Sequence, residues 1–339
     1  MERGFDEHGL GTAAGAGGVR QEEGELAMGD GYRLPLVTWR PAGTAKALVI
    51  GVHAFGDFRS AFEEIGPALA RRGYLVHAFD QRGFGDTLGH GRWHGWRRLT
   101  RDLHQVIEAL RPARGEPVYL LGESLGGGVA LVAAARFRPP GVAGVILVEP
   151  AVRRGVRWRL MRDMAVGTLA LLAPGYSRRL QRGLHPELTL RARTRLAEDP
   201  RIVRVIRADA YKGLLSLANA ASAATRRVKL PVLFLYGRAD GIIPLHLFEQ
   251  AVRDLEPRVT ALRYPHAPHL LLQTESWPEV LADVAAWIEG SPLPASVEGV
   301  LLRPGPRPGE PLPEPKRRPL VPRVRLKHLG SRGAGPPAG

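Results

Sequence analysis

A serine between two glycines, placed where one apolar run ends and another begins, constrains this fold more than any other sequence feature. The run Val118–Leu121 is typical of a buried strand, and Leu125–Phe137 is typical of a helix. Ser124 lies between them in a Gly-x-Ser-x-Gly motif. The chain must therefore turn sharply, and Gly122 and Gly126 remove the Cβ atoms that would clash in the turn. This pattern predicts a nucleophile elbow that presents the Ser124 hydroxyl above the sheet edge.

Two residues downstream strengthen this interpretation, because a Gly-rich turn alone also serves helix packing or phosphate binding. Asp240 follows the predicted strand Val232–Tyr236, and His269 lies in a later loop. A serine hydroxyl is a poor nucleophile unless an imidazole accepts its proton, and a carboxylate must orient that imidazole. We therefore expect Ser124, His269 and Asp240 to form a catalytic triad. His266 is the alternative histidine.

The developing oxyanion of an acyl-transfer reaction also needs hydrogen-bond donors. The backbone N–H of Leu125 follows the nucleophile and is one candidate. The loop His53–Asp57 follows an earlier predicted strand and offers the second, for which we select the amide of Phe55. His53 is expected to brace this loop, and Asp80 with Arg82 to tie the turn after the next strand.

Several motifs together resemble the monoglyceride lipase and lysophospholipase branch of the serine α/β-hydrolases. The resemblance covers roughly residues 30–290. The matching segments are His53–Asp57, Phe79–Gly85, Gly122–Gly127, Tyr236–Asp240 with Ile243 and Pro244, and His269 followed by Gln273 and Glu275. This resemblance implies an α/β-hydrolase fold, in which a mostly parallel central sheet is covered by helices and carries a helical cap insertion. It also implies hydrolysis of lipid monoesters.

The chain departs from that branch at two places. Ala54 stands where members usually have glycine in the oxyanion loop, which adds a methyl group there. Asp86-Thr87 replaces the Arg-Ser or Lys-Ser that they often carry. These changes leave the predicted triad intact and concern substrate preference.

Apolar runs divide the chain into predicted elements and segments. Strands are predicted at 34–39, 47–53, 74–79, 118–121, 142–148, 232–236 and 258–263, and helices at 61–71, 99–110, 125–137, 247–255 and 277–288. We expect a disordered lead (1–27), a core (28–150 and 230–290), a helical basic cap (151–229) and a disordered, Pro-rich basic tail (291–339). Met28 is an alternative start.

Positive charge is concentrated in the predicted cap. The chain has a net charge of +15, and residues 151–229 contain 18 Lys and Arg against 5 Asp and Glu. Such a surface attracts nucleic acid, anionic lipid or an anionic head group. No nucleic-acid-binding module accompanies it, so no specific nucleic acid is expected. The apolar segment Leu160–Ala173, preceded by arginines, is typical of an interfacial membrane helix. The alternative is a helix over the active site with solvated arginines.

Composition also limits which cofactors the chain can be expected to bind and where in the cell it can be expected to lie. The chain has no cysteine, which excludes disulfides and thiol chemistry and favours a cytoplasmic protein, with peripheral membrane contact as an alternative. Neither a signal peptide nor a membrane-spanning run is evident. Gly126–Gly128 lacks the following Lys of a phosphate-binding loop, and His90 and His94 lie among glycines without a third ligand. No metal or cofactor is expected.

These observations predict a serine hydrolase that cleaves carboxylic esters through an acyl-enzyme on Ser124, with lysophospholipids or monoacylglycerols as substrates. A proline-type aminopeptidase is one alternative. Another is a non-catalytic, hydrolase-like protein that binds a ligand, and a third is an adaptor for anionic membrane or nucleic acid. The sequence leaves acyl length, head group and oligomeric state open.

Overall fold

A computed structural model describes residues 12–14, 18–153, 157–173, 175–180, 183, 185–293, 300–303, 306 and 308–310. Strands are β1 (Thr12–Ala14), β2 (Arg20–Ala27), β3 (Arg33–Arg40), β4 (Ala47–Val52), β5 (Tyr74–Phe79), β6 (Val118–Glu123), β7 (Val142–Val148), β8 (Ser177–Arg179), β9 (Val205–Arg207), β10 (Val232–Gly237), β11 (Val259–Tyr264) and β12 (Val300–Arg303). Helices are α1 (Ile65–Arg71), α2 (Trp96–Leu110), α3 (Leu125–Phe137), α4 (Arg157–Leu172), α5 (Leu190–Glu198), α6 (Ala208–Ala224), α7 (Leu245–Leu255) and α8 (Trp277–Glu289), with short 3-10 turns η1 (Arg59–Phe62) and η2 (Leu271–Gln273).

A 10-stranded sheet runs through the molecule in the order β1-β2-β3-β5-β4-β6-β7-β10-β11-β12. The six strands from β5 to β11 in this order are parallel, and antiparallel strands extend the sheet at both edges. Strands β4, β6 and β10 are buried along their whole length, as expected for parallel strands covered on both faces. The predicted mostly parallel, helix-covered sheet is confirmed.

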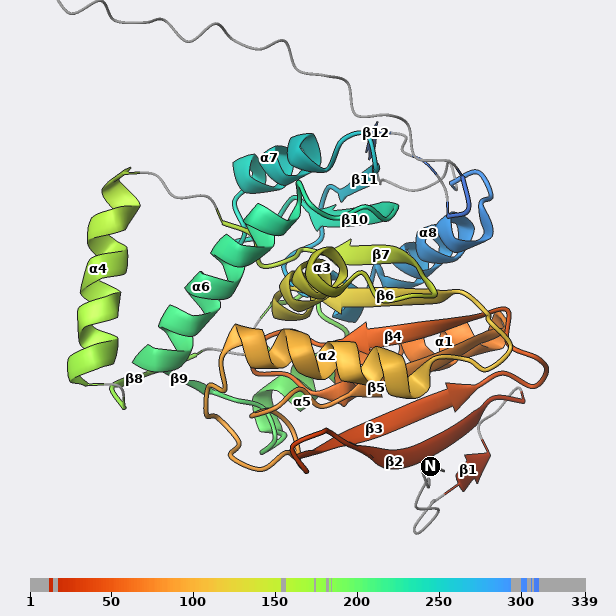
Figure 1. Ribbon diagram of the computed structural model, residues 1–339, viewed down its shortest axis with the longest axis horizontal. Helices are drawn as coiled ribbons and strands as arrows, with labels where there is room; N and C mark the ends of the chain where they lie inside the picture. Colours follow the sequence, from red (N-terminus) through yellow and green to blue (C-terminus); the bar gives the residue numbers. More distant parts are fainter. Residues whose placement is uncertain are drawn as a thin grey trace, which may run out of the picture.

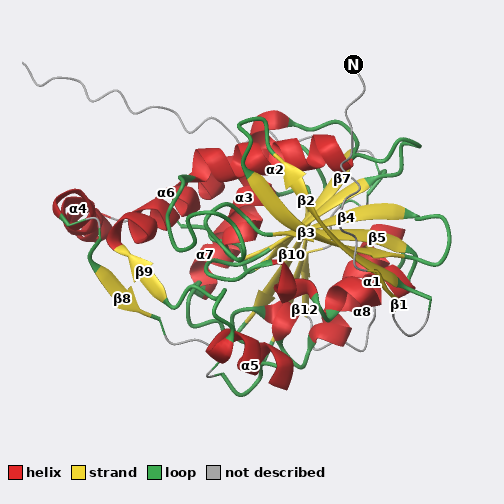
Figure 2. Ribbon diagram, turned by 90° about the horizontal axis from the view of Figure 1, so that it is seen from below, coloured by secondary structure: helices red, strands yellow, loops and turns green. Residues whose placement is uncertain are grey.

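Helices cover both faces of this sheet and create two hydrophobic cores. On one face lie α2, α3 and α7, and on the other α1 and α8 (Figures 1 and 2). Leu103, Val129 and Phe248 belong to the first core, whereas Leu69 and Val284 belong to the second. The sheet is thus the middle of three layers, and the loops at the carboxyl ends of its parallel strands are free to carry a site.

The expected disordered lead is wrong over Arg20–Ala27, which forms strand β2. This strand pairs with β3 along eight residues, and the neighbouring Val19 and the strand residue Leu26 are buried. The indole N–H of Trp39 donates to Gln21 at 2.9 Å. Glu23 and Glu25 are exposed on β2 and Glu22 is half-buried, and this Glu-rich composition hid the strand from a composition argument. Residues 1–11 lie outside the described residues.

The expected disordered tail also needs correction, because β12 at Val300–Arg303 pairs antiparallel with β11. The apolar run Val300–Leu302 lies along a sheet edge, where main-chain groups are available for pairing. The basic Pro-rich segment from 311 to 339 lies outside the described residues.

Between β7 and β10 the chain leaves the sheet, where the sequence places the cap. It forms α4, α5, α6 and the small antiparallel sheet of β8 and β9. Helix α4 stands at the edge of the molecule beside α6, and α6 lies against α3 of the core (Figures 1 and 2). Helix α5 packs elsewhere: its Ala192 and Leu196 contact Ala54 and Phe58 of the loop after β4.

Strand β2 makes the start of the chain testable. A protein beginning at Met28 should unfold at a melting temperature roughly 5–10 °C below that of the full chain, because it loses the buried Val19 and Leu26, each contributing about 1.5–3 kcal/mol. Circular dichroism during heating measures this. Equal melting temperatures for the two proteins would show that β2 adds nothing to stability.

Candidate active site

The turn at Ser124 joins β6 to α3 in a strained conformation. Ser124 has φ 52°, a left-handed value that costs energy for a residue with a side chain. Its amide donates to the Val148 carbonyl at 2.9 Å, and its carbonyl accepts from Ala151 at 2.8 Å, so the end of β7 holds the turn in place. A Cβ on Gly126 would lie 1.9 Å from the Val52 carbonyl oxygen. The predicted need for glycine there is confirmed.

The three predicted triad residues meet at the carboxyl ends of β6, β10 and β11. His269 Nε2 lies 2.9 Å from Ser124 Oγ, and His269 Nδ1 lies 2.9 Å from Asp240 Oδ2. These separations are hydrogen-bond distances, and the order is the one that proton transfer from the serine requires. The side chain of Asp240 is fully buried, whereas that of His269 remains 11% exposed. The alternative, His266, is exposed on the surface.

Backbone amides fix the orientation of Asp240. Its Oδ1 accepts hydrogen bonds from Ile242 at 2.6 Å and Ile243 at 2.9 Å, in the turn before α7. Oδ2 is therefore left to accept the Nδ1–H of His269. A histidine that donates from Nδ1 has its Nε2 lone pair free to take the Ser124 proton.

The loop after β4 is organised by a neutral histidine, as the sequence predicted. His53 Nε2 accepts from the Gln81 amide at 3.0 Å, so Nδ1 must carry the proton and donate to the Ala54 carbonyl at 2.8 Å. Burial lowers the pKa of His53, which keeps it neutral. Phe55 is buried in this loop, and Leu125 opens α3, where first-turn amides have no intrahelical acceptor. Both predicted oxyanion donors thus lie in the segments expected for them.

A buried polar network joins cap helix α5 to this loop and to Glu123, the residue before Ser124. Arg195 of α5 forms an ion pair with Asp57, and its second Nη atom donates to Gln273 Oε1 at 2.6 Å. Gln273 Nε2 donates to Asp57 at 3.1 Å and to Glu123 at 2.8 Å. Glu123 directly precedes Ser124. Four segments distant in sequence are therefore connected beside the nucleophile.

Burial and neighbouring groups shift the pKa values of two carboxyl groups in this network. Burial alone would raise the pKa of Asp57, but the neighbouring Arg195 lowers it, so Asp57 is a carboxylate. Burial raises the pKa of Glu123 to about 7, although Gln273 and the Leu272 amide donate to it. Glu123 therefore serves as a buried hydrogen-bond acceptor for Gln273 and Leu272. A structural role for Arg195 was not predicted, because a single arginine among many in the cap gives no signal.

The prediction that Asp80 and Arg82 tie the turn after β5 is confirmed for Asp80, whose Oδ2 accepts from the amide of Asp86 at 2.9 Å. Asp80 also accepts from Arg59 at 2.6 Å, while Arg82 binds Asp102 at 2.8 Å and 3.0 Å and so connects the turn to α2. Asp86, one of the departures noted above, also accepts from Arg59, at 2.9 Å.

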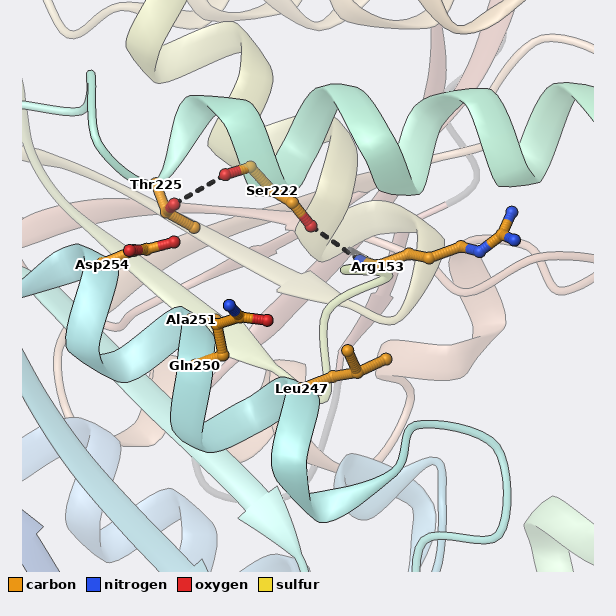
Figure 3. A pocket seen from close by; sticks show the side chains of 7 residues that line it. All are labelled: Arg153, Ser222, Thr225, Leu247, Gln250, Ala251 and Asp254. Carbon is orange, nitrogen blue, oxygen red and sulfur yellow. Dashed lines mark hydrogen bonds between the residues drawn. The ribbon is translucent and has the colours of Figure 1, made fainter. Parts of the chain in front are cut away.

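Two other features have the residues or the space of a ligand site. Glu149, Asp240 and His269 bring atoms of ligand type within 4.8 Å of one another, but a cation there would displace the Nδ1 proton that Asp240 accepts. A cavity of about 10 Å³ lies between α6 and α7, near the hydrogen bond from the Arg153 amide to Ser222 (Figure 3). It has room for about one water molecule, so it is too small for a substrate.

Comparison with known families agrees with this geometry. The model of the family described as "Serine aminopeptidase, S33" matches residues 43–276, which include all three triad positions. The chain belongs to this family.

Individual lipases are similar to this chain over different shares of its length. Human monoglyceride lipase is 34% identical over 39% of this chain, and the alignment spans 44% of the human protein. Monoacylglycerol lipase from Mycolicibacterium smegmatis is 27% identical over 80% of this chain and 97% of its own. The crystal structure of Paleococcus ferrophilus monoacylglycerol lipase has a TM-score of 0.63 and 25% identity, covering 75% of this chain and 97% of that one. The α/β-hydrolase fold is confirmed.

The network around Arg195 predicts a large loss of stability for one substitution. Arg195→Ala should lower the free energy of unfolding by about 3–5 kcal/mol, because it leaves Asp57 buried without its partner. Arg191→Ala is the matched control on the same helix. Arg191 is 62% exposed and pairs with Glu63 at 3.4 Å, so its loss should cost under about 1 kcal/mol. Urea unfolding measures both. Similar losses for the two variants would contradict a special role for Arg195.

Proposed function

We propose that this chain is a serine hydrolase that cleaves carboxylic esters of lipids through an acyl-enzyme on Ser124. The observation that carries the proposal is the hydrogen-bonded series Ser124, His269 and Asp240, with both separations at 2.9 Å. Its position after β6, β10 and β11 and the family membership support the same conclusion.

The reaction follows from the hydrogen bonds. His269 Nε2 takes the proton of Ser124 as its Oγ bonds to the ester carbonyl carbon, and Asp240 stabilises the resulting imidazolium. The amides of Phe55 and Leu125 stabilise the negative charge on the carbonyl oxygen. The intermediate then expels the alcohol, which takes the proton from His269. Water attacks the acyl-enzyme by the same route, releasing the fatty acid and restoring Ser124.

Monoacylglycerols are the substrate class that the comparisons favour, with lysophospholipids as the related alternative. The relative from Mycolicibacterium smegmatis, which the alignment covers almost completely, is named a monoacylglycerol lipase. The family description mentions aminopeptidases, but the relatives reported above are named lipases. Ester hydrolysis is therefore preferred to removal of an N-terminal proline, and a formed triad argues against a non-catalytic binding protein.

Labelling of the nucleophile tests this function. A fluorophosphonate probe should label the wild-type protein and fail to label Ser124→Ala, and the variant should lose at least about 10⁴-fold in kcat on monoacylglycerol. Prolyl-aminocoumarin, tested alongside, should be a poor substrate. A folded wild-type protein that resists labelling would contradict the proposal, and fast cleavage of the prolyl compound with no ester hydrolysis would favour the aminopeptidase.

We further propose that the outer part of the cap contacts anionic membranes. Met164, Leu171, Leu172 and Tyr176 are each more than 60% exposed, which is unusual for large apolar side chains grouped on one helix and the turn after it. Arg178 and Arg179 are exposed beside them in β8. Apolar side chains next to arginines are typical of surfaces that insert into the interface of an anionic bilayer. None of the helices in the described ranges is long and apolar enough to cross a membrane.

Vesicle binding tests the membrane surface. Partitioning onto vesicles of phosphatidylglycerol should fall about tenfold when both Leu171 and Leu172 are changed to Ser, because two side chains then lose their apolar burial. Leu88→Ser is the control, since Leu88 is 81% exposed on a loop of the core. It should leave partitioning unchanged. Equal partitioning of all three proteins would remove this surface from consideration.

A further inference from the structure

A second carboxyl group lies behind the histidine of the candidate triad. Glu149 follows β7, its side chain is fully buried, and its Oε2 lies 3.7 Å from His269 Nδ1. Its backbone has φ 45°. Such strain persists only where surrounding contacts enforce it, and it is concentrated at functional sites. A role for Glu149 was not predicted from the sequence, although a glutamate at the end of an apolar strand is a detectable signal.

The carboxyl group of Glu149 holds both loops that carry its neighbours. Oε1 accepts from the amide of Gly237 at 2.9 Å, at the end of the strand leading to Asp240. Oε2 accepts from the amide of Leu271 at 3.3 Å, just after His269. A Cβ on Gly237 would lie 2.6 Å from Oε1, so the glycine leaves room for this contact.

Two buried carboxyl groups so close together are unfavourable if both are ionised. Asp240 accepts three hydrogen bonds, from Ile242, Ile243 and His269, whereas Glu149 accepts two from backbone amides. The negative charge is therefore best placed on Asp240, and the proton on Glu149. Consistently, burial, followed by the charges of Asp240 and Glu123, holds the pKa of Glu149 well above its usual range.

We propose that Glu149 is a reserve acid and positioning residue for His269: it stays protonated beside the Asp240 carboxylate, and it accepts the hydrogen bond from Nδ1–H of His269 when the Asp240 carboxylate is removed. The inference rests on the proposed hydrolase function. In the intact protein Glu149 is neutral and holds the two loops. Without the Asp240 carboxylate, the repulsion is gone, Glu149 ionises more readily, and its Oε2 needs only a small shift to accept from Nδ1.

Two substitutions at Asp240 should therefore differ. In Asp240→Asn the oxygen must stay at the Oδ1 position, because two amides donate to it, so the NH₂ group faces His269 Nδ1 and enforces the wrong tautomer. That variant should lose about 10⁴-fold in kcat. In Asp240→Ala nothing blocks Nδ1, and Glu149 can accept its proton. This variant should retain at least about tenfold more activity than the asparagine variant.

The experiment compares kcat on a soluble p-nitrophenyl ester from pH 5 to pH 9 for wild type, Asp240→Asn, Asp240→Ala and Asp240→Ala with Glu149→Gln. The ratio of kcat for Asp240→Ala to kcat for the double variant should grow as pH rises, because Glu149 then loses its proton. In the intact protein the titratable groups that face Glu149 are Asp240, Glu123 and His269. The control is Asp240→Ala with Asp283→Asn. Asp283 is a buried carboxyl group bonded to Tyr264 in another part of the fold, and its change should leave the residual rate within about twofold.

The outcomes separate the inference from the function on which it rests. If Asp240→Ala and Asp240→Asn have equal rates at every pH, Glu149 is not a reserve acid, and this comparison does not require Glu149→Gln to fold. Equal rates for Asp240→Ala and the double variant overturn the proposal in the same way. Asp240→Ser replaces the alanine variant if the latter does not fold. Failure of the wild type to react with a fluorophosphonate would instead reject the proposed function.

Discussion

The close approach of α3 to β4 is the constraint on which the site depends. The elbow fits only because Gly126 lets the helix begin against the carbonyl groups at the end of β4. Ser124, at the start of this helix, has the positive φ of a strained nucleophile elbow. The contact at Gly126 also places the start of α3 beside the loop that carries Phe55. One packing contact in the backbone thus brings together the proposed nucleophile and the segments that carry both proposed oxyanion donors.

Two buried carboxyl groups near the proposed triad are neutralised in different ways. Asp57 remains ionised because Arg195 compensates its charge within a network that also binds Gln273. Glu149 has no cationic partner of comparable strength among the described residues, and a proton neutralises it instead. The two solutions have different consequences: the ion pair ties the cap to the oxyanion loop, whereas the neutral acid leaves a group near the triad that titrates.

Helices α5 and α4 of the cap contact different parts of the surroundings. Helix α5 packs onto the oxyanion loop through Ala192 and Leu196, and its Arg195 reaches the network. Helix α4 lies at the edge of the molecule and exposes Leu171 and Leu172. Because the two helices face different surroundings, substitutions can test the stability of the site and the proposed contact with a lipid surface separately. The experiments with Arg195→Ala and with the leucine substitutions exploit this separation.

The sequence by itself determined the elements whose signals are local. The strand before Ser124, the helix after it, and the parallel sheet follow from apolar periodicity and glycine placement, and the order of Ser124, Asp240 and His269 indicated the triad. The tertiary structure decided the rest. Strand β2 is stable only because β3 is beside it, which a Glu-rich composition conceals.

The contacts of Glu149 with Leu271 and of Arg195 with Asp57 join residues more than 100 positions apart. Such pairings depend on how strands and loops are stacked in space, so no periodicity along the chain records them. Burial raises the pKa of both Asp57 and Glu149, but Arg195 lowers that of Asp57 again, which explains why two buried carboxyl groups near the proposed triad have opposite protonation states.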